Sequence, residues 1–336
     1  MRPTILLGIA VVGAIAVTGA NAGAPHVRVT VFARTGQNVD SIAWTGQQFL
    51  YVLNTENTVV AAPPAGLPTA PFATMPNLVE ETRCILSPGT HGFPPRAIFC
   101  HSPDNKIYEI SADGSTTSVF ATLPAPYPPA SDGALAFDNV GRFGYRLVAA
   151  TGRSGAATPA GGSVYTIDAT GGVQEIGTYT APGGADEVVI APATFGSFAG
   201  DALLTVDAGA SGGYVIAMDP SGRRKTLASF PGDGPNPIVA IPTRVEQAGA
   251  PAPGVHLTDD VTQDIYYVSA SQLAPFAGDL FVATEAEGYF WILAPHGHGI
   301  RALTLENTLG KSGHGLEGAI YIGQRGWRRA RRTGRA

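Results

Sequence analysis

Acidic side chains recur at one position of a repeated pattern, at the start of successive short apolar segments. The acids that share this position are Asp40, Glu81, Asp132, Glu187, Asp264 and Glu317. If the segments are strands around a common axis, their carboxylates meet at one mouth, where like charges raise one another's pKa or require a cation. Oxygen ligands suit Ca²⁺ and other hard divalent cations, so the pattern predicts such a site. The ligands that we predict for it are Asp40, Asp132, Glu187 and Glu317. The alternative is that Asp and Gly only form the turn that leads into each strand.

Motifs for nucleophilic catalysis are absent from the sequence. Ser154 and Ser312 lack the full Gly-x-Ser-x-Gly pattern of a nucleophile elbow. Among the histidines, His314 is the strongest candidate for a functional role, because it lies three residues before Glu317. The residues therefore indicate ion binding more strongly than covalent chemistry.

The chain has two cysteines, Cys84 and Cys100, each within an apolar segment. The residues between them, 87–95, are rich in Gly and Pro, so the two segments can form a hairpin in which the cysteines face each other. We expect a disulfide between them, since an exported chain can keep one. Two buried free thiols are the alternative.

A seven-residue pattern recurs four times and indicates which elements carry these residues. In each copy a large apolar residue lies six positions before a glycine and an aliphatic residue lies four before it, which is a strand that ends in a turn. The copies are residues 108–114, 165–171, 216–222 and 291–297. Other strand patterns surround each copy, in the order of a four-stranded meander followed by a proline-marked connection. That unit is the blade of a β-propeller, so we predict an all-β propeller of about six blades, with five or seven as alternatives.

The two ends of the predicted ring have complementary patterns. Residues 27–33 have the pattern of an outermost strand, and residues 316–322 that of an innermost one. Sharing one blade between the two ends would close the ring and remove its sheet edges. Two middle strands of that blade are missing after Ile322, and the interval between the innermost strands expected near Asn236 and Asp264 is short for a blade.

Two segments carry a resemblance to known propellers. Residues 106–114 and 131–138 resemble NHL-repeat propellers and the six-bladed senescence-marker-protein/gluconolactonase-like group. The second resemblance implies a divalent metal in the channel, held by a Glu, two Asn and an Asp. Asp132 matches the family's Asp, and Glu317 or Glu81 would supply the Glu. The nearest residues to the paired Asn are Asn38 and Asn236, and neither is a clear match.

Composition and charge limit the domain organisation and the classes of partner. The chain has 336 residues, of which 14% are charged, and its net charge is −5. Residues 1–22 have a positive start, a short apolar run and an Ala-x-Ala end, which predicts a signal peptide. We assign residues 23–323 to the propeller and residues 324–336, with six arginines, to a basic, disordered tail. The rest of the chain is acidic, which disfavours nucleic-acid binding.

Together these features predict a secreted, monomeric propeller without a transmembrane span. We expect it to bind a small ligand or an extracellular protein, with Ca²⁺ or another divalent cation in the channel. The alternative function is a metal-dependent lactonase or esterase of the gluconolactonase-like type.

Overall fold

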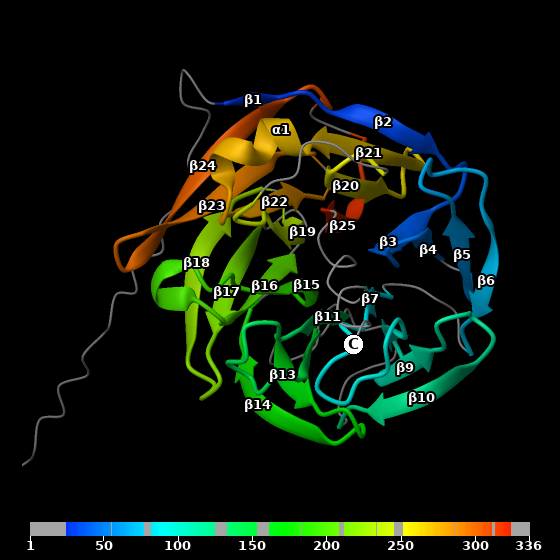
Figure 1. Cartoon of the computed structure of the whole chain (residues 1–336). Coiled ribbons are helices and arrows are strands. Elements are labelled where there is room, and N and C mark those ends of the chain that lie inside the picture. Colours follow the sequence, from blue (N-terminus) through cyan, green and yellow to red (C-terminus); the bar gives the residue numbers. More distant parts are fainter. Residues whose placement is uncertain are drawn as a thin grey trace, which may run out of the picture.

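The computed structural model is a ring of six β-sheet blades around a central channel (Figure 1). It describes residues 25–323 except 55, 77–81, 125–132, 153–160, 182, 208–211, 233, 245–250, 286 and 311–312. The predicted signal peptide, the arginine-rich tail, Glu81 and Asp132 lie outside the described residues. The prediction of an all-β propeller with six blades is confirmed.

Four blades are meanders of four strands that follow one another in the chain, from the channel outward. The first contains β3 (Val39–Trp44), β4 (Phe49–Leu53), β5 (Thr58–Ala62) and β6 (Ala70–Thr74). The second contains β7 (Cys84–Leu86), β8 (Ile98–Ser102), β9 (Lys106–Ile110) and β10 (Thr117–Thr122). The third contains β11 (Gly133–Phe137), β12 (Leu147–Thr151), β13 (Gly162–Ile167) and β14 (Val173–Tyr179). The fourth contains β15 (Ala185–Ile190), β16 (Ala202–Asp207), β17 (Gly213–Met218) and β18 (Arg224–Phe230).

The last two blades exchange segments of the chain. The fifth blade contains β19 (Pro235–Ala240), β22 (Leu280–Thr284), β23 (Phe290–His296), β24 (Gly299–Asn307) and a short fifth strand, β1 (His26–Val27). The sixth contains β25 (Leu316–Ile322), β20 (Gly254–Asp259), β21 (Asp264–Ser269) and β2 (Thr30–Arg34). Thus the chain leaves the fifth blade after one strand, builds the middle of the sixth, and then returns, so that red β25 lies beside gold β20 in Figure 1.

This exchange accounts for both irregularities in the sequence pattern. The two middle strands that do not follow Ile322 are β20 and β21, which come earlier in the chain than β22. Closure of the ring by an outer strand from the amino end is confirmed, because β2 pairs with β21. The expectation of an innermost strand at Asp264 is wrong: Asp264 begins β21, the third strand of its blade.

The repeated seven-residue pattern forms the third strand of a blade and the turn after it. Its glycine is needed for two reasons in the second blade. Gly114 has a φ of +76°, and a Cβ at this position would overlap the backbone carbonyl of Phe72 in outer strand β6 of the preceding blade. Gly171 and Gly222 abut β10 and β14 in the same way. Three of the four copies therefore mark where one blade rests against the edge of the previous one, whereas Gly297 of the fourth copy has no neighbour within 4 Å.

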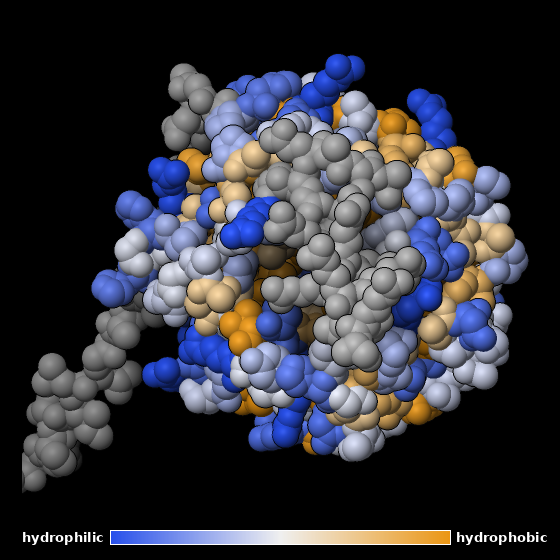
Figure 2. All heavy atoms as spheres, viewed as in Figure 1, coloured by the Kyte–Doolittle hydropathy of each residue, from blue (hydrophilic) through white to orange (hydrophobic). Residues whose placement is uncertain are grey.

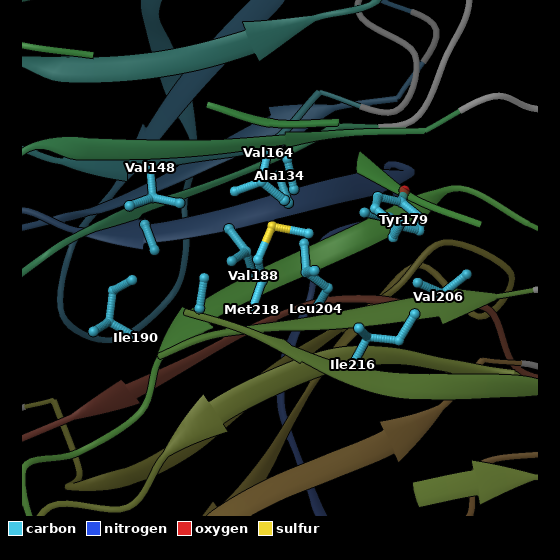
Figure 3. Packing of buried hydrophobic residues seen from close by; sticks show 14 of the residues in the cluster. Ala134, Val148, Val164, Tyr179, Val188, Ile190, Leu204, Val206, Ile216 and Met218 are labelled. Atoms are coloured by element: carbon cyan, nitrogen blue, oxygen red, sulfur yellow. The ribbon is translucent and has the colours of Figure 1, made fainter. Parts of the chain in front are cut away.

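Apolar side chains fill the space between neighbouring blades. Every residue of β4, β12 and β22 is buried, because the second strand of a blade has a neighbouring blade on each face. Figure 3 shows one such layer, where Val148 and Val164 of the third blade lie near Leu204 and Met218 of the fourth. Burying each side chain of this size stabilises the fold by about 1.5–3 kcal/mol, so blade-to-blade packing holds the ring together.

Helical structure is sparse in the described part of the chain. It consists of α1 (Ala270–Leu273) and two short 3₁₀ turns, Gly196–Phe198 and Ala274–Phe276. Within the residues that the structure describes, no helix has the length and apolar character needed to span a bilayer.

Candidate ligand-binding channel

Four innermost strands are irregular at the end where they begin. Each has a β-bulge against the second strand of its blade, after Val39 in β3, after Ala185 in β15, after Pro235 in β19, and opposite Thr258 in β25. A bulge turns the backbone and re-aims a side chain away from regular pairing. The residues displaced in this way include Asp40, Asp186, Asn236 and Glu317. All four contact one side chain, Arg83.

Arg83 immediately precedes β7 and closes this end of the channel. Its side chain is 3% exposed. A guanidinium has five N–H donors, and five acceptors surround this one. Nε donates to the Asp186 carbonyl (3.1 Å), Nη1 to the carbonyl (3.4 Å) and to Oδ1 of Asp40, and Nη2 to Asn236 Oδ1 (3.4 Å) and Glu317 Oε2 (3.1 Å). The hydrogen-bonding capacity of Arg83 is therefore used within the protein.

Two threonines on second strands hold the bulges in place. Thr205 Oγ1 accepts a hydrogen bond from the Glu187 amide (3.1 Å) and donates to the Asn236 carbonyl in the next blade (2.6 Å). Thr258 Oγ1 accepts from the Gly318 amide (2.7 Å) and lies 3.4 Å from the Asp40 carbonyl in the first blade. Each hydroxyl satisfies a backbone group that the bulge leaves without a ladder partner, and each links two blades.

Beyond Arg83 the channel widens into a cavity of about 360 Å³. All six innermost strands contribute to its wall, which is largely apolar. Wall residues include Ile42, Leu135, Val189, Ile238 and Ile320. Figure 2 shows hydrophobic residues in the hollow near the centre of one face, beside atoms drawn in grey. A cavity of this size and lining is typical of small-molecule sites.

The far end of the cavity has aromatic residues and an outlet. Trp44 ends β3 and Tyr321 lies near the end of β25, and both line the cavity. A second hollow of about 610 Å³ starts here and shares Ala240 and Tyr321 with the first. Arg83 thus lies at one end of the channel and the aromatic residues at the other.

Glu187 is the one acidic residue among the described residues that line the cavity. It lies in β15 next to the bulge, and its Oε1 accepts a hydrogen bond from the Val188 amide (3.2 Å). Protein surrounds the carboxyl although part of it faces the cavity. Burial therefore raises the pKa of Glu187 to about 7, and the positive charge of Arg83 only partly opposes this rise.

The predicted acids have different positions in the structure. Asp40 and Glu317 meet at Arg83, and Glu187 lies beside them on the cavity wall. Sequence reasoning missed Arg83 and Asp186. Arg83 could have been found from its position, because a charged residue directly before a buried cysteine in an innermost strand needs partners. Asn236 was singled out, but as a metal ligand and not as a partner of arginine.

The described residues do not fit the predicted metal site. Asp40 and Glu317 are 0% and 7% exposed at their side chains, and the guanidinium of Arg83 lies between them. Nowhere in the described part of the chain do three or more His, Cys, Asp or Glu side chains form a cluster suited to a metal ion. Asp132 lies outside the described residues, so a site that includes it stays a prediction.

His314 lies away from the cavity wall and pairs with a buried acid. Its Nδ1 is 2.6 Å from Asp259 Oδ2, and its ring and that of Tyr266 form a T-shaped pair with centroids 6.0 Å apart. Asp259 also accepts from the Gly315 amide (3.2 Å). This pair fixes the segment that leads into β25.

Cys84 and Cys100 are joined by a disulfide, with an S–S distance of 2.05 Å. They face each other across the β7–β8 pair. The bond ties the short innermost strand of the second blade, which follows directly after Arg83, to its neighbour.

Comparison with known proteins shows the fold alone. No family model matches the chain, and a search of curated proteins found no match. A solved chain from a nidogen/laminin complex has a TM-score of 0.54 at 11% identity, and the match covers 86% of each chain. A streptogramin B lyase structure matches with a TM-score of 0.48 at 11% identity, over 82% of this chain and 72% of that one. The propeller fold expected from the NHL-type resemblance is thus supported.

Proposed function

We propose that the protein is a binding module that holds a small, largely apolar ligand in its central channel. The observation that carries this proposal is the cavity of about 360 Å³, which has apolar walls and ends at Arg83. Because all five donors of Arg83 are engaged, this end is a fixed boundary. A ligand would enter from the end with Trp44 and Tyr321.

Two other functions have less support. One structural neighbour comes from a nidogen/laminin complex, which makes a protein partner a second candidate, but that likeness concerns the fold only. A metal-dependent lactonase or esterase needs a metal with an open coordination position. The described carboxylates that would hold it, Asp40 and Glu317, are bound to Arg83.

We also propose that the protein acts outside the cytoplasm. Residues 1–22 have the pattern of a signal peptide, and a disulfide persists in an oxidising compartment. Detection of the mature protein, starting near Gly23, in a secreted or periplasmic fraction would test this.

The channel can be tested by blocking it. Val189 lies two residues after Glu187 on β15 and lines the cavity, so Val189→Trp would fill the lumen. Val119 is 51% exposed on outer strand β10, so Val119→Trp is a matched control. With prodan, a neutral apolar fluorophore, as the probe, we expect saturable binding by the wild type and Val119→Trp, and at least about tenfold weaker binding by Val189→Trp.

Equal binding by both tryptophan variants would overturn the channel proposal. Thermal unfolding of each variant shows whether it is folded. If Val189→Trp does not fold, Ala319→Leu on β25 narrows the same cavity with a smaller side chain.

A further inference from the structure

Among the described residues, the closed end of the channel has more acidic groups than basic ones. These are the carboxyl groups of Asp40, Asp186, Glu187 and Glu317, beside the guanidinium of Arg83. Asp40 and Glu317 form ion pairs with Arg83. Asp186 accepts a hydrogen bond from the Asp207 amide (2.8 Å). Glu187 is left without an ion pair in the part of the chain that the structure describes.

Glu187 is placed so that a ligand could reach it. It lines the cavity together with Val188 and Val189, and its side chain is partly exposed, as that of Val189 is, whereas Val188 is 4% exposed. The hydrogen bond from the Val188 amide goes to Oε1. No described residue donates to Oε2, so this oxygen is available to a donor in the cavity.

The electrostatics of the channel favour a positive charge on the ligand. An anion would find no donor on Arg83, whose five N–H groups already have acceptors, and it would face an excess of carboxylates. A cation would give the buried Glu187 carboxylate the partner that it lacks, which offsets the cost of burying that charge. Trp44 and Tyr321 add aromatic faces along the path of entry.

This inference rests on the proposed function and names the class of ligand. We propose that the ligand is a small apolar amine, whose ammonium group pairs with the Glu187 carboxylate while its hydrocarbon or aromatic part fills the channel. One carboxylate and an apolar wall match one ammonium and an apolar body. The amine need not displace any contact of Arg83.

The pH dependence of binding follows from this pairing. Among the described residues, Arg83 is the charged group that acts on Glu187. The groups bound to Arg83 are Asp186 on β15, Asp40 on β3, Glu317 on β25 and the neutral Asn236 on β19. Burial raises the pKa of Glu187 to about 7, and an alkyl ammonium loses its proton near pH 10. Affinity for an amine should therefore rise as pH increases through 7 and fall again near pH 10.

The test compares three probes of one shape: phenethylamine, 2-phenylethanol and 3-phenylpropanoate, measured by calorimetry at pH 8. In the wild type we expect the amine to bind at least about tenfold more tightly than the alcohol, and the carboxylate not to bind. Glu187→Gln should reduce this preference to about twofold without abolishing binding of the alcohol. Glu306→Gln, on an exposed residue of β24, is the matched control and should keep the full preference.

The outcomes separate the two proposals. Equal affinity for amine and alcohol in the wild type, or a preference that persists in Glu187→Gln, would overturn the proposal that the ligand is an amine. The proposal of a binding site in the channel would stand. Binding of none of the probes, with prodan also excluded, would overturn both. Calcium binding that is lost in Glu187→Gln would replace the amine with a metal ion. If Glu187→Gln does not fold, the wild-type comparison decides, and equal affinity for the amine, the alcohol and the carboxylate refutes the pairing.

Discussion

Arg83 Nη2 donates a hydrogen bond to Glu317 Oε2 at 3.1 Å, across the channel and between residues separated by 234 positions in the chain. Arg83 belongs to the second blade and Glu317 to the innermost strand of the blade that closes the ring. Asn236 Nδ2 donates to the same carboxylate oxygen (2.9 Å) and so adds the fifth blade to this network. The ring is therefore joined at its centre by polar contacts as well as between blades by apolar packing.

Arg83→Met should destabilise the protein severely. It removes the one cation between Asp40 and Glu317, and leaving buried charges unpaired costs about 3–5 kcal/mol. Urea unfolding followed by circular dichroism measures the loss. Arg28→Met, on an exposed residue, should change the unfolding free energy by less than about 0.5 kcal/mol.

A compensating variant tests the cause of that loss. Combining Arg83→Met with Asp40→Asn and Glu317→Gln removes the unpaired charges along with the cation. We expect the triple variant to regain a large part of the lost stability, because unpaired charges, and not lost packing, cause most of the destabilisation by Arg83→Met. If the triple variant is as unstable as Arg83→Met, the ion pairs do not account for the effect.

Glu187 should make stability fall as pH rises. Its pKa is about 7 in the folded protein and 4.5 ordinarily, so between these values the folded state keeps a proton that the unfolded state has released. The contribution of Glu187 to the unfolding free energy is thus complete below pH 4.5 and declines by about 1.4 kcal/mol per pH unit up to pH 7. The difference in unfolding free energy between the wild type and Glu187→Gln, measured by urea unfolding across this range, isolates the contribution of Glu187. It cancels the opposite effect of buried His101 and His256, whose pKa values burial lowers to about 4. A difference that stays constant with pH would contradict the assignment.

Gly133→Ala should destabilise the third blade through His101. A Cβ at Gly133 would overlap the imidazole of His101, which is fully buried in β8. Overpacking of this kind costs about 1–3 kcal/mol. In a His101→Ala background the added methyl group has room, so Gly133→Ala should be nearly neutral there, and the double-mutant cycle measures the coupling. Gly299→Ala is the control, because its nearest neighbour would be at an ordinary 3.7 Å.

Removing the disulfide should lower the unfolding free energy by about 3 kcal/mol, as expected for a loop of this length. The variant to measure is Cys84→Ala with Cys100→Ala. Because the chain has two cysteines, a reducing agent should destabilise the wild type to a similar extent and leave the variant unchanged. An equal response of both proteins to the reducing agent would show that the bond contributes little.

The fold could be predicted from the sequence because its signals are local. In four blades a pattern of seven residues predicts the third strand and the turn after it, and in three of them the glycine lies against the preceding blade. The exchange between the last two blades could not be predicted, since pairing of β19 with β22 leaves no mark within either strand. Counting strands in chain order led instead to an innermost strand at Asp264.

The centre of the channel was predicted in part. The positions of Asp40, Glu187 and Glu317 followed from the period of the repeat. Their partner did not, because a ring of acids predicts a positive charge but not its source. Arg83 supplies this positive charge, and bulges turn Asp186 and Asn236 toward Arg83. Both facts depend on contacts between segments far apart in the chain.

The exchanged blades also affect how the protein can be made. During synthesis β20 and β21 leave the ribosome before β25, the strand that must lie between β20 and the channel. Domains generally fold as units once they emerge, yet here the sixth blade stays incomplete until the segment Leu316–Ile322 has been translated, although its two middle strands precede the last three strands of the fifth blade. That final segment also delivers the Glu317 carboxylate to Arg83. A chain released before this segment would thus have an open sheet edge at β20, and its Arg83 would keep the ion pair with Asp40 but lack the one with Glu317.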